Sequence, residues 1–103
     1  MVLPAPVVAE VGYLLHHRGS ARAESAFLRS LAAGDFRTIE LTVEDYARMA
    51  ELVDTYSDLP LGTSDAAVIA LAERLKLTEV ATLDHRHFRI VRPQHCDALT
   101  LLP

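Results

Sequence analysis

The feature that most constrains this chain is the alternation of short apolar runs with longer segments of helical periodicity. Residues 36–41, 80–83 and 99–102 are short runs rich in β-branched, aromatic or leucine residues, as in buried strands. In the segments before residue 36 and between residues 41 and 80, apolar residues recur every three or four positions, which is the spacing of an amphipathic helix. This alternation predicts an α/β domain with a mostly parallel sheet.

Local signals predict where the first two helices begin and end. Residues 2–3 are expected to end a short strand, and a proline after them suits the first turn of a helix that runs to about His17. The Gly-Ser pair at residues 19–20 should break this helix. A second helix follows and is expected to end at Gly34, because glycine readily adopts the left-handed conformation found at helix C-termini.

Similar signals predict two further helices. Residues 42–45, Thr-Val-Glu-Asp, resemble a capping box that would open the third helix. The apolar stripe of this helix is expected to consist of Tyr46, Ala50 and Val53. A turn is expected at residues 58–62, and the fourth helix should run from residue 63 or 64 to about residue 76.

Length and composition exclude several classes of protein. A chain of 103 residues predicts one domain, residues 1–103. The longest apolar run, residues 66–72, is far shorter than the roughly 20 residues that span a bilayer, and we expect no secretory signal. Cys96 is the only cysteine, so no intramolecular disulfide can form, which fits a cytoplasmic protein. The net charge of −4 argues against bulk attraction of nucleic acid, so such contacts would need local basic clusters or bound cations.

Three carboxylates occupy positions where a metal site could form. Glu10 lies on the same helical stripe as the apolar residues of the first helix, a face expected to pack inward. Asp65 opens the fourth helix, and Asp84 directly follows the strand at residues 80–83. The carboxyl edge of a parallel sheet is where ligands bind, and acids gathered there need a cation between them. Mg²⁺ prefers carboxylate and water oxygens, so the sequence predicts a shared divalent-cation site.

Each acid also has a simpler structural explanation. Asp65 could complement the dipole of its helix, and Asp84 could be an ordinary loop aspartate in a turn. Glu10 is harder to explain in this way, because a carboxylate on an inward face costs stability unless it is paired or coordinated. Basic residues cluster at residues 16–18 and 85–92, where they could contact phosphates or simply be solvated.

Several segments resemble those of VapC-type PIN-domain toxins. Residues 4–11, PAPVVAEV, resemble the segment that carries the second acidic residue of that family. Residues 58–66, DLPLGTSDA, resemble the stretch leading into the third, and residues 80–84, VATLD, resemble the strand and loop that carry the fourth. The closing residues 99–103 resemble the last strand. The resemblance covers essentially the whole chain, with three motifs in the right order and at the right spacing.

The resemblance implies a PIN-like, Rossmann-like fold of three layers and an endoribonuclease activity. In this family, Mg²⁺ or Mn²⁺ is held by a quartet of acids, and Glu10, Asp65 and Asp84 match three of them, as metal ligands and catalytic residues. The ions would activate a water for in-line attack on phosphorus. Thr82 is expected to orient Asp84 or a bound water. The implied partners are an RNA substrate, a second copy of the chain, and a VapB-type antitoxin of a type II toxin–antitoxin system.

The chain departs from the family pattern at its beginning. These toxins open with a strand that carries an aspartate, whereas the first acid here is Glu10. We therefore expect a domain that is truncated at its N-terminus and lacks one acid of the quartet. Two hypotheses follow: a metal-dependent ribonuclease that hydrolyses RNA phosphodiester bonds, or a catalytically inactive module of the same fold that binds an antitoxin or self-associates.

Overall fold

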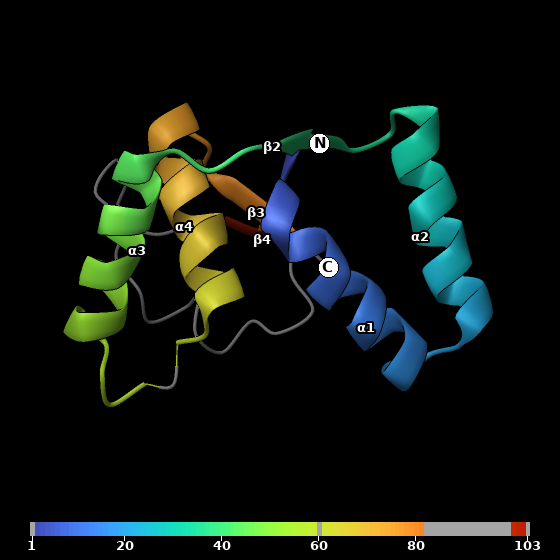
Figure 1. The fold of residues 1–103 in the computed structure, drawn as a ribbon, viewed down its shortest axis with the longest axis horizontal. Helices are drawn as coiled ribbons and strands as arrows, with labels where there is room; N and C mark the ends of the chain where they lie inside the picture. Colours follow the sequence, from blue (N-terminus) through green and yellow to red (C-terminus); the bar gives the residue numbers. More distant parts are fainter. Residues whose placement is uncertain (1, 60, 82–99, 103) are drawn as a thin grey trace. The chain divides into compact units, whose positions relative to one another are not determined.

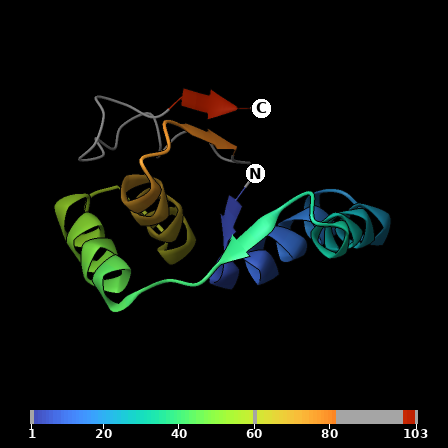
Figure 2. The ribbon, with the colours of Figure 1, turned by 90° about the horizontal axis from the view of Figure 1, so that it is seen from above.

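Helices and short strands alternate along the chain as predicted (Figure 1). The structure is a computed structural model, and it describes residues 2–59, 61–81 and 100–102. The chain divides into two compact units, Met1–Leu41 and Thr42–Pro103, and each is described by itself. Each unit contains a parallel pair of strands, so the predicted direction of the sheet is confirmed within both (Figure 2).

The first unit is built around a parallel strand pair. Strand β1 (Val2–Pro4) pairs with β2 (Arg37–Ile39), with Val2 opposite Arg37 and Pro4 opposite Ile39. A parallel pair needs a long crossover, and the two helices between these strands supply it. A 3-10 turn, η1 (Ala5–Val7), leads from β1 into α1 (Val8–Arg18), and a proline at its start suits this first helical turn.

Helix α2 (Ala21–Ala33) begins and ends with defined caps. The hydroxyl of Ser20 accepts a hydrogen bond of 3.1 Å from the backbone N–H of Ala23. Gly34 adopts the predicted left-handed conformation, with φ of 85°, and the N–H of Asp35 donates to the carbonyl of Ser30 at 3.0 Å. This is the Schellman pattern that closes helix C-termini, and it confirms the predicted end of the helix.

In the second unit, α3 (Val43–Thr55) opens with the predicted capping box. The N–H of Thr42 donates to Asp45 Oδ2 at 2.9 Å, and the N–H of Asp45 donates to Thr42 Oγ1 at 3.1 Å. Two backbone donors at the helix N-terminus are thereby satisfied by side chains.

Replacing Thr42 by alanine is expected to lower the free energy of unfolding by about 1 kcal/mol, because the N–H of Asp45 loses its acceptor. Thr55→Ala, at the other end of the same helix, is the matched control and should change stability by only a few tenths of a kcal/mol. Urea unfolding followed by circular dichroism measures both variants. Equal effects for the two variants would show that the cap contributes nothing.

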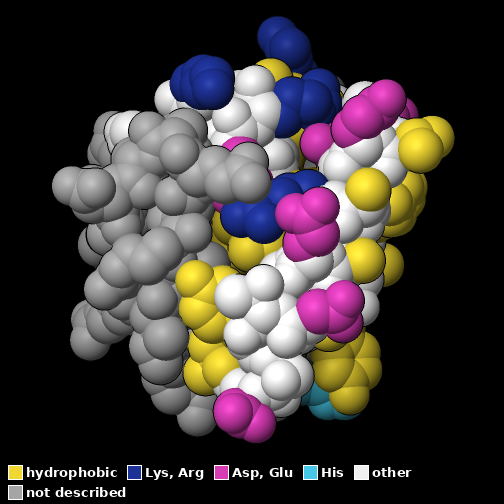
Figure 3. Space-filling model, turned by 90° about the vertical axis from the view of Figure 1, so that its left-hand side faces the viewer, with side chains coloured by type: hydrophobic (Ala, Val, Ile, Leu, Met, Phe, Trp, Pro, Cys, Tyr) yellow, Lys and Arg dark blue, Asp and Glu magenta, His cyan; other side chains and the backbone are white. Residues whose placement is uncertain are grey.

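The predicted apolar stripe of α3 is wrong. Tyr46 is 53% exposed, and Ala50 and Val53 are exposed as well, whereas Met49 and Leu52 are buried. Figure 3 shows hydrophobic side chains exposed beside acidic ones on the side of the molecule that includes α3. The helix instead buries the side that carries Met49 and Leu52, and its Asp45 and Arg48 form ion pairs with α4.

Among the residues of the second unit whose burial is described, helix α4 (Thr63–Leu75) supplies most of the buried core. It is apolar around most of its circumference, as expected of a helix covered on several sides. Its fully buried residues include Ala66, Ile69 and Ala70. Lys76 ends it in the left-handed conformation, with φ of 58°. The chain continues into β3 (Glu79–Ala81), which pairs in parallel with β4 (Thr100–Leu102).

No helix within the described part of the chain is long and apolar enough to cross a membrane.

Candidate functional site

Glu10 lies in the first turn of α1, shortly after the carboxyl end of β1. The prediction that it faces inward is wrong. Val7 is buried, whereas the Glu10 side chain is exposed at the border of the apolar stripe. A carboxylate in a first turn lies near the positive end of the helix dipole, where its negative charge is stabilised.

Asp65 occupies the equivalent place in α4, again in the first turn of its helix. Its side chain is half-buried, and it follows the buried Leu61 and the exposed Gly62. A Cβ atom placed on Gly62 would meet Asp65 Oδ2 at 3.9 Å, so the backbone of Gly62 flanks the carboxylate. The two predicted ligands that the structure describes thus share one local arrangement, a carboxylate in the first turn of a helix.

The other predicted site residues, Asp84 and Thr82, lie outside the described residues, as does the basic cluster at 85–92. Glu10 and Asp65 belong to the two separately described units. Within the residues that the structure describes, no three His, Cys, Asp or Glu side chains gather closely enough to hold a metal ion. The convergence of Glu10, Asp65 and Asp84 on one ion therefore stays a prediction.

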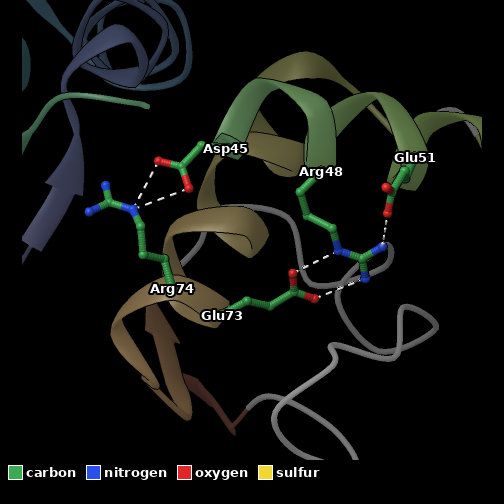
Figure 4. A network of polar contacts seen from close by, with 5 residues as sticks. All are labelled: Asp45, Arg48, Glu51, Glu73 and Arg74. Carbon is green, nitrogen blue, oxygen red and sulfur yellow. Dashed lines mark hydrogen bonds and ion pairs between the residues drawn. The ribbon is translucent and has the colours of Figure 1, made fainter. Parts of the chain in front are cut away.

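Two other acids of the second unit are buried, and arginines neutralise both (Figure 4). Glu73 on α4 is 8% exposed and accepts two hydrogen bonds from Arg48 on α3. These run from Nε to Oε1 at 2.7 Å and from Nη2 to Oε2 at 3.0 Å. Such a two-point contact between a guanidinium and a carboxylate is the strongest common form of ion pair. The hydrogen bond to Glu73 raises the pKa of Arg48, although burial opposes this.

The second pair joins the same helices with the charges exchanged. Arg74 on α4 donates from Nε to both oxygens of the buried Asp45 on α3, at 3.1 and 3.0 Å. Asp45 therefore caps its own helix and also anchors α4. Because Asp45 and Glu73 each hold a guanidinium, they are structural acids rather than candidates for cation binding. The sequence analysis missed this network, since the paired residues lie 25 and 29 positions apart and leave no local signal.

The donor chemistry of the remaining candidates suits a hard divalent cation. Glu10 and Asp65 offer carboxylate oxygens, which Mg²⁺ and Mn²⁺ prefer over softer ligands. A single carboxylate binds such an ion weakly, so ligands from several elements are needed.

Comparison with known proteins adds independent information. The family model described as "PIN domain" matches residues 1–93. The chain is also 36% identical, over 103 residues, to a protein named Ribonuclease VapC26 from Mycobacterium tuberculosis. That alignment covers 100% of this chain and 76% of the relative.

Proposed function

This chain belongs to the PIN-domain family, and from that membership we propose that it is an endoribonuclease, the toxin component of a type II toxin–antitoxin system. The observation that carries the proposal is the 36% identity, along the whole chain, to a protein named as a ribonuclease of the VapC type. The reaction is the hydrolysis of RNA phosphodiester bonds.

We further propose that Glu10, Asp65 and Asp84 hold Mg²⁺ or Mn²⁺. The placement of Glu10 and Asp65 in the first turns of their helices supports this. A bound divalent ion would polarise the phosphate and lower the pKa of an attacking water. The three carboxylates would position this ion against the scissile phosphate, and Thr82 would orient Asp84.

The proposed partners are an RNA substrate, a VapB-type antitoxin and a second copy of the chain, in the cytoplasm. The VapC designation of the relative supports the antitoxin, since toxins of this type are paired with a VapB partner. With a net charge of −4 the chain has no overall positive field to attract phosphates, so RNA binding would rely on local basic residues or on bound cations.

The test is cleavage of single-stranded RNA by the purified protein, with Mg²⁺ and with a chelator. We expect cleavage that the chelator abolishes and that added Mg²⁺ or Mn²⁺ restores, because the carboxylates alone cannot activate water. Cleavage that persists in the chelator would contradict the metal-dependent mechanism. A folded protein that cleaves no RNA in Mg²⁺ would favour the inactive interaction module.

A further inference from the structure

Helix α1 carries a cluster of rings beyond its candidate metal ligand. The Tyr13 and His17 rings lie one turn apart, with centroids 4.1 Å apart and planes tilted by 43°. The ring of His16 meets that of His17 edge-on, with centroids 5.5 Å apart. Tyr13 is 60% exposed, and His17 is also exposed. A pair of rings in tilted contact is therefore presented to solvent.

One ring of this cluster, that of His16, is paired with a residue of α2. His16 Nδ1 lies 3.1 Å from Glu24 Oε1 on α2. The Glu24 side chain also lies beside the buried Gly12, one turn earlier on α1. His16 is thus paired with the neighbouring helix, and its ring contacts the ring of His17 edge-on.

The ring pair shares a helix face with Glu10. Tyr13 and His17 follow Glu10 by three and seven positions, which are neighbouring positions on one side of a helix. At about 1.5 Å of rise per residue, they lie roughly 4.5 and 10.5 Å along the axis from Glu10. All three side chains are exposed, so a strand of RNA lying along this face could reach each of them.

We propose that Tyr13 and His17 form a stacking platform for a base of single-stranded RNA whose scissile phosphate lies near Glu10, an inference that rests on the proposed ribonuclease function. Unpaired bases stack on aromatic and histidine rings, largely irrespective of sequence. Arg18 and Arg22 are exposed at the adjoining ends of α1 and α2, where they suit the neighbouring phosphates. The mixture of rings and charges fits a nucleotide better than an apolar protein surface.

A simpler explanation exists for each component. Rings one turn apart stabilise a helix, and basic residues near its C-terminus complement the dipole. Neither explanation requires the rings to contact a base, so a test must separate stacking from helix stability.

The experiment compares binding of a labelled single-stranded RNA with that of an abasic oligonucleotide of equal length, in a chelator that prevents cleavage. Wild type should prefer the RNA. Tyr13→Leu should bind it roughly 5- to 150-fold more weakly, which is the range for loss of one stacked base. Tyr13→Phe should keep the affinity, because the ring remains. Tyr46→Leu is the matched control, since Tyr46 is an exposed tyrosine on α3.

Melting curves of each variant show whether unfolding causes any loss of RNA binding. If Tyr13→Leu unfolds, Tyr13→Phe still tests the proposal. Unchanged RNA affinity in Tyr13→Leu, or an equal loss for the abasic oligonucleotide, would overturn the platform. If Tyr13→Leu changed the sedimentation of the protein but not its RNA affinity, the rings would serve self-association, and the proposed stacking platform would be overturned. If wild type still binds and cleaves RNA in these cases, only the platform fails. If wild type neither binds nor cleaves RNA, the proposed function fails as well.

Discussion

Asp65→Asn and Glu10→Gln are each expected to lower Mg²⁺-dependent RNA cleavage by at least about 100-fold. Both changes keep the shape of the side chain and remove one negative ligand from the proposed ion. Loss of a residue that merely supports a metal ligand costs about 10- to 100-fold, so loss of a ligand itself should cost more. Initial rates of cleavage at saturating Mg²⁺ measure the effect.

The matched control is Glu44→Gln, because Glu44 is an exposed acid in the first turn of α3. It should cleave RNA at the wild-type rate. If all three acids serve only the helix dipole, all three variants will be equally active and slightly less stable, by about 0.3–1 kcal/mol. A lower melting temperature for Asp65→Asn without metal, together with unchanged metal affinity, would identify Asp65 as a helix-start residue.

The second large effect is expected at the ion pair between α3 and α4. Arg48→Ala should lower the free energy of unfolding by about 3 kcal/mol, because it removes the guanidinium from a carboxylate that is 8% exposed. The estimate is at the lower end of the range for buried pairs, since the Arg48 side chain is itself 20% exposed. Urea unfolding measures the change.

Two further variants test whether the burial of the ion pair explains the loss of stability in Arg48→Ala. Glu51 also pairs with Arg48 but is 64% exposed, so Glu51→Gln should cost less than about 1 kcal/mol. The double variant Arg48→Met with Glu73→Leu should recover most of the loss, because two apolar side chains replace two buried charges. Similar small losses for Arg48→Ala and Glu51→Gln would show that the buried pair contributes no more than a surface contact.

The stabilisation from Arg48 should not depend on pH in the physiological range. Its pKa is raised in the folded chain by the hydrogen bond to Glu73. A group with a raised folded-state pKa contributes stability that is fully present below its ordinary pKa, which for arginine lies far above the physiological range, and this stability is lost only above that pKa. Any change in stability between about pH 5 and pH 9 must therefore come from other groups.

Features encoded by neighbouring residues could be predicted from the sequence. The capping box at Thr42 and Asp45 depends on a few adjacent positions, and so does the left-handed Gly34. The parallel direction of β1 and β2 followed from the two helices predicted between them, because a parallel pair requires a crossover. Asp65 was identified as a helix-start acid for the same local reason.

Features that depend on distant contacts could not be predicted. Tyr46 and Val53 belong to the predicted apolar stripe of α3, yet the helix buries the side that carries Asp45, Met49 and Leu52. That choice depends on Arg74, which lies 29 positions away. The outward position of Glu10 likewise reflects how the turn at residues 5–7 enters α1, and periodicity alone does not specify this.

The most direct test of the shared metal site is Mn²⁺ binding, followed by electron paramagnetic resonance, in wild type and in three single variants. Glu10→Gln, Asp65→Asn and Asp84→Asn should each weaken binding at one common site, because each removes a carboxylate from the same ion. Glu44→Gln should bind Mn²⁺ as tightly as wild type. Wild-type Mn²⁺ affinity in any of the three ligand variants would contradict the proposal that these acids hold one ion together.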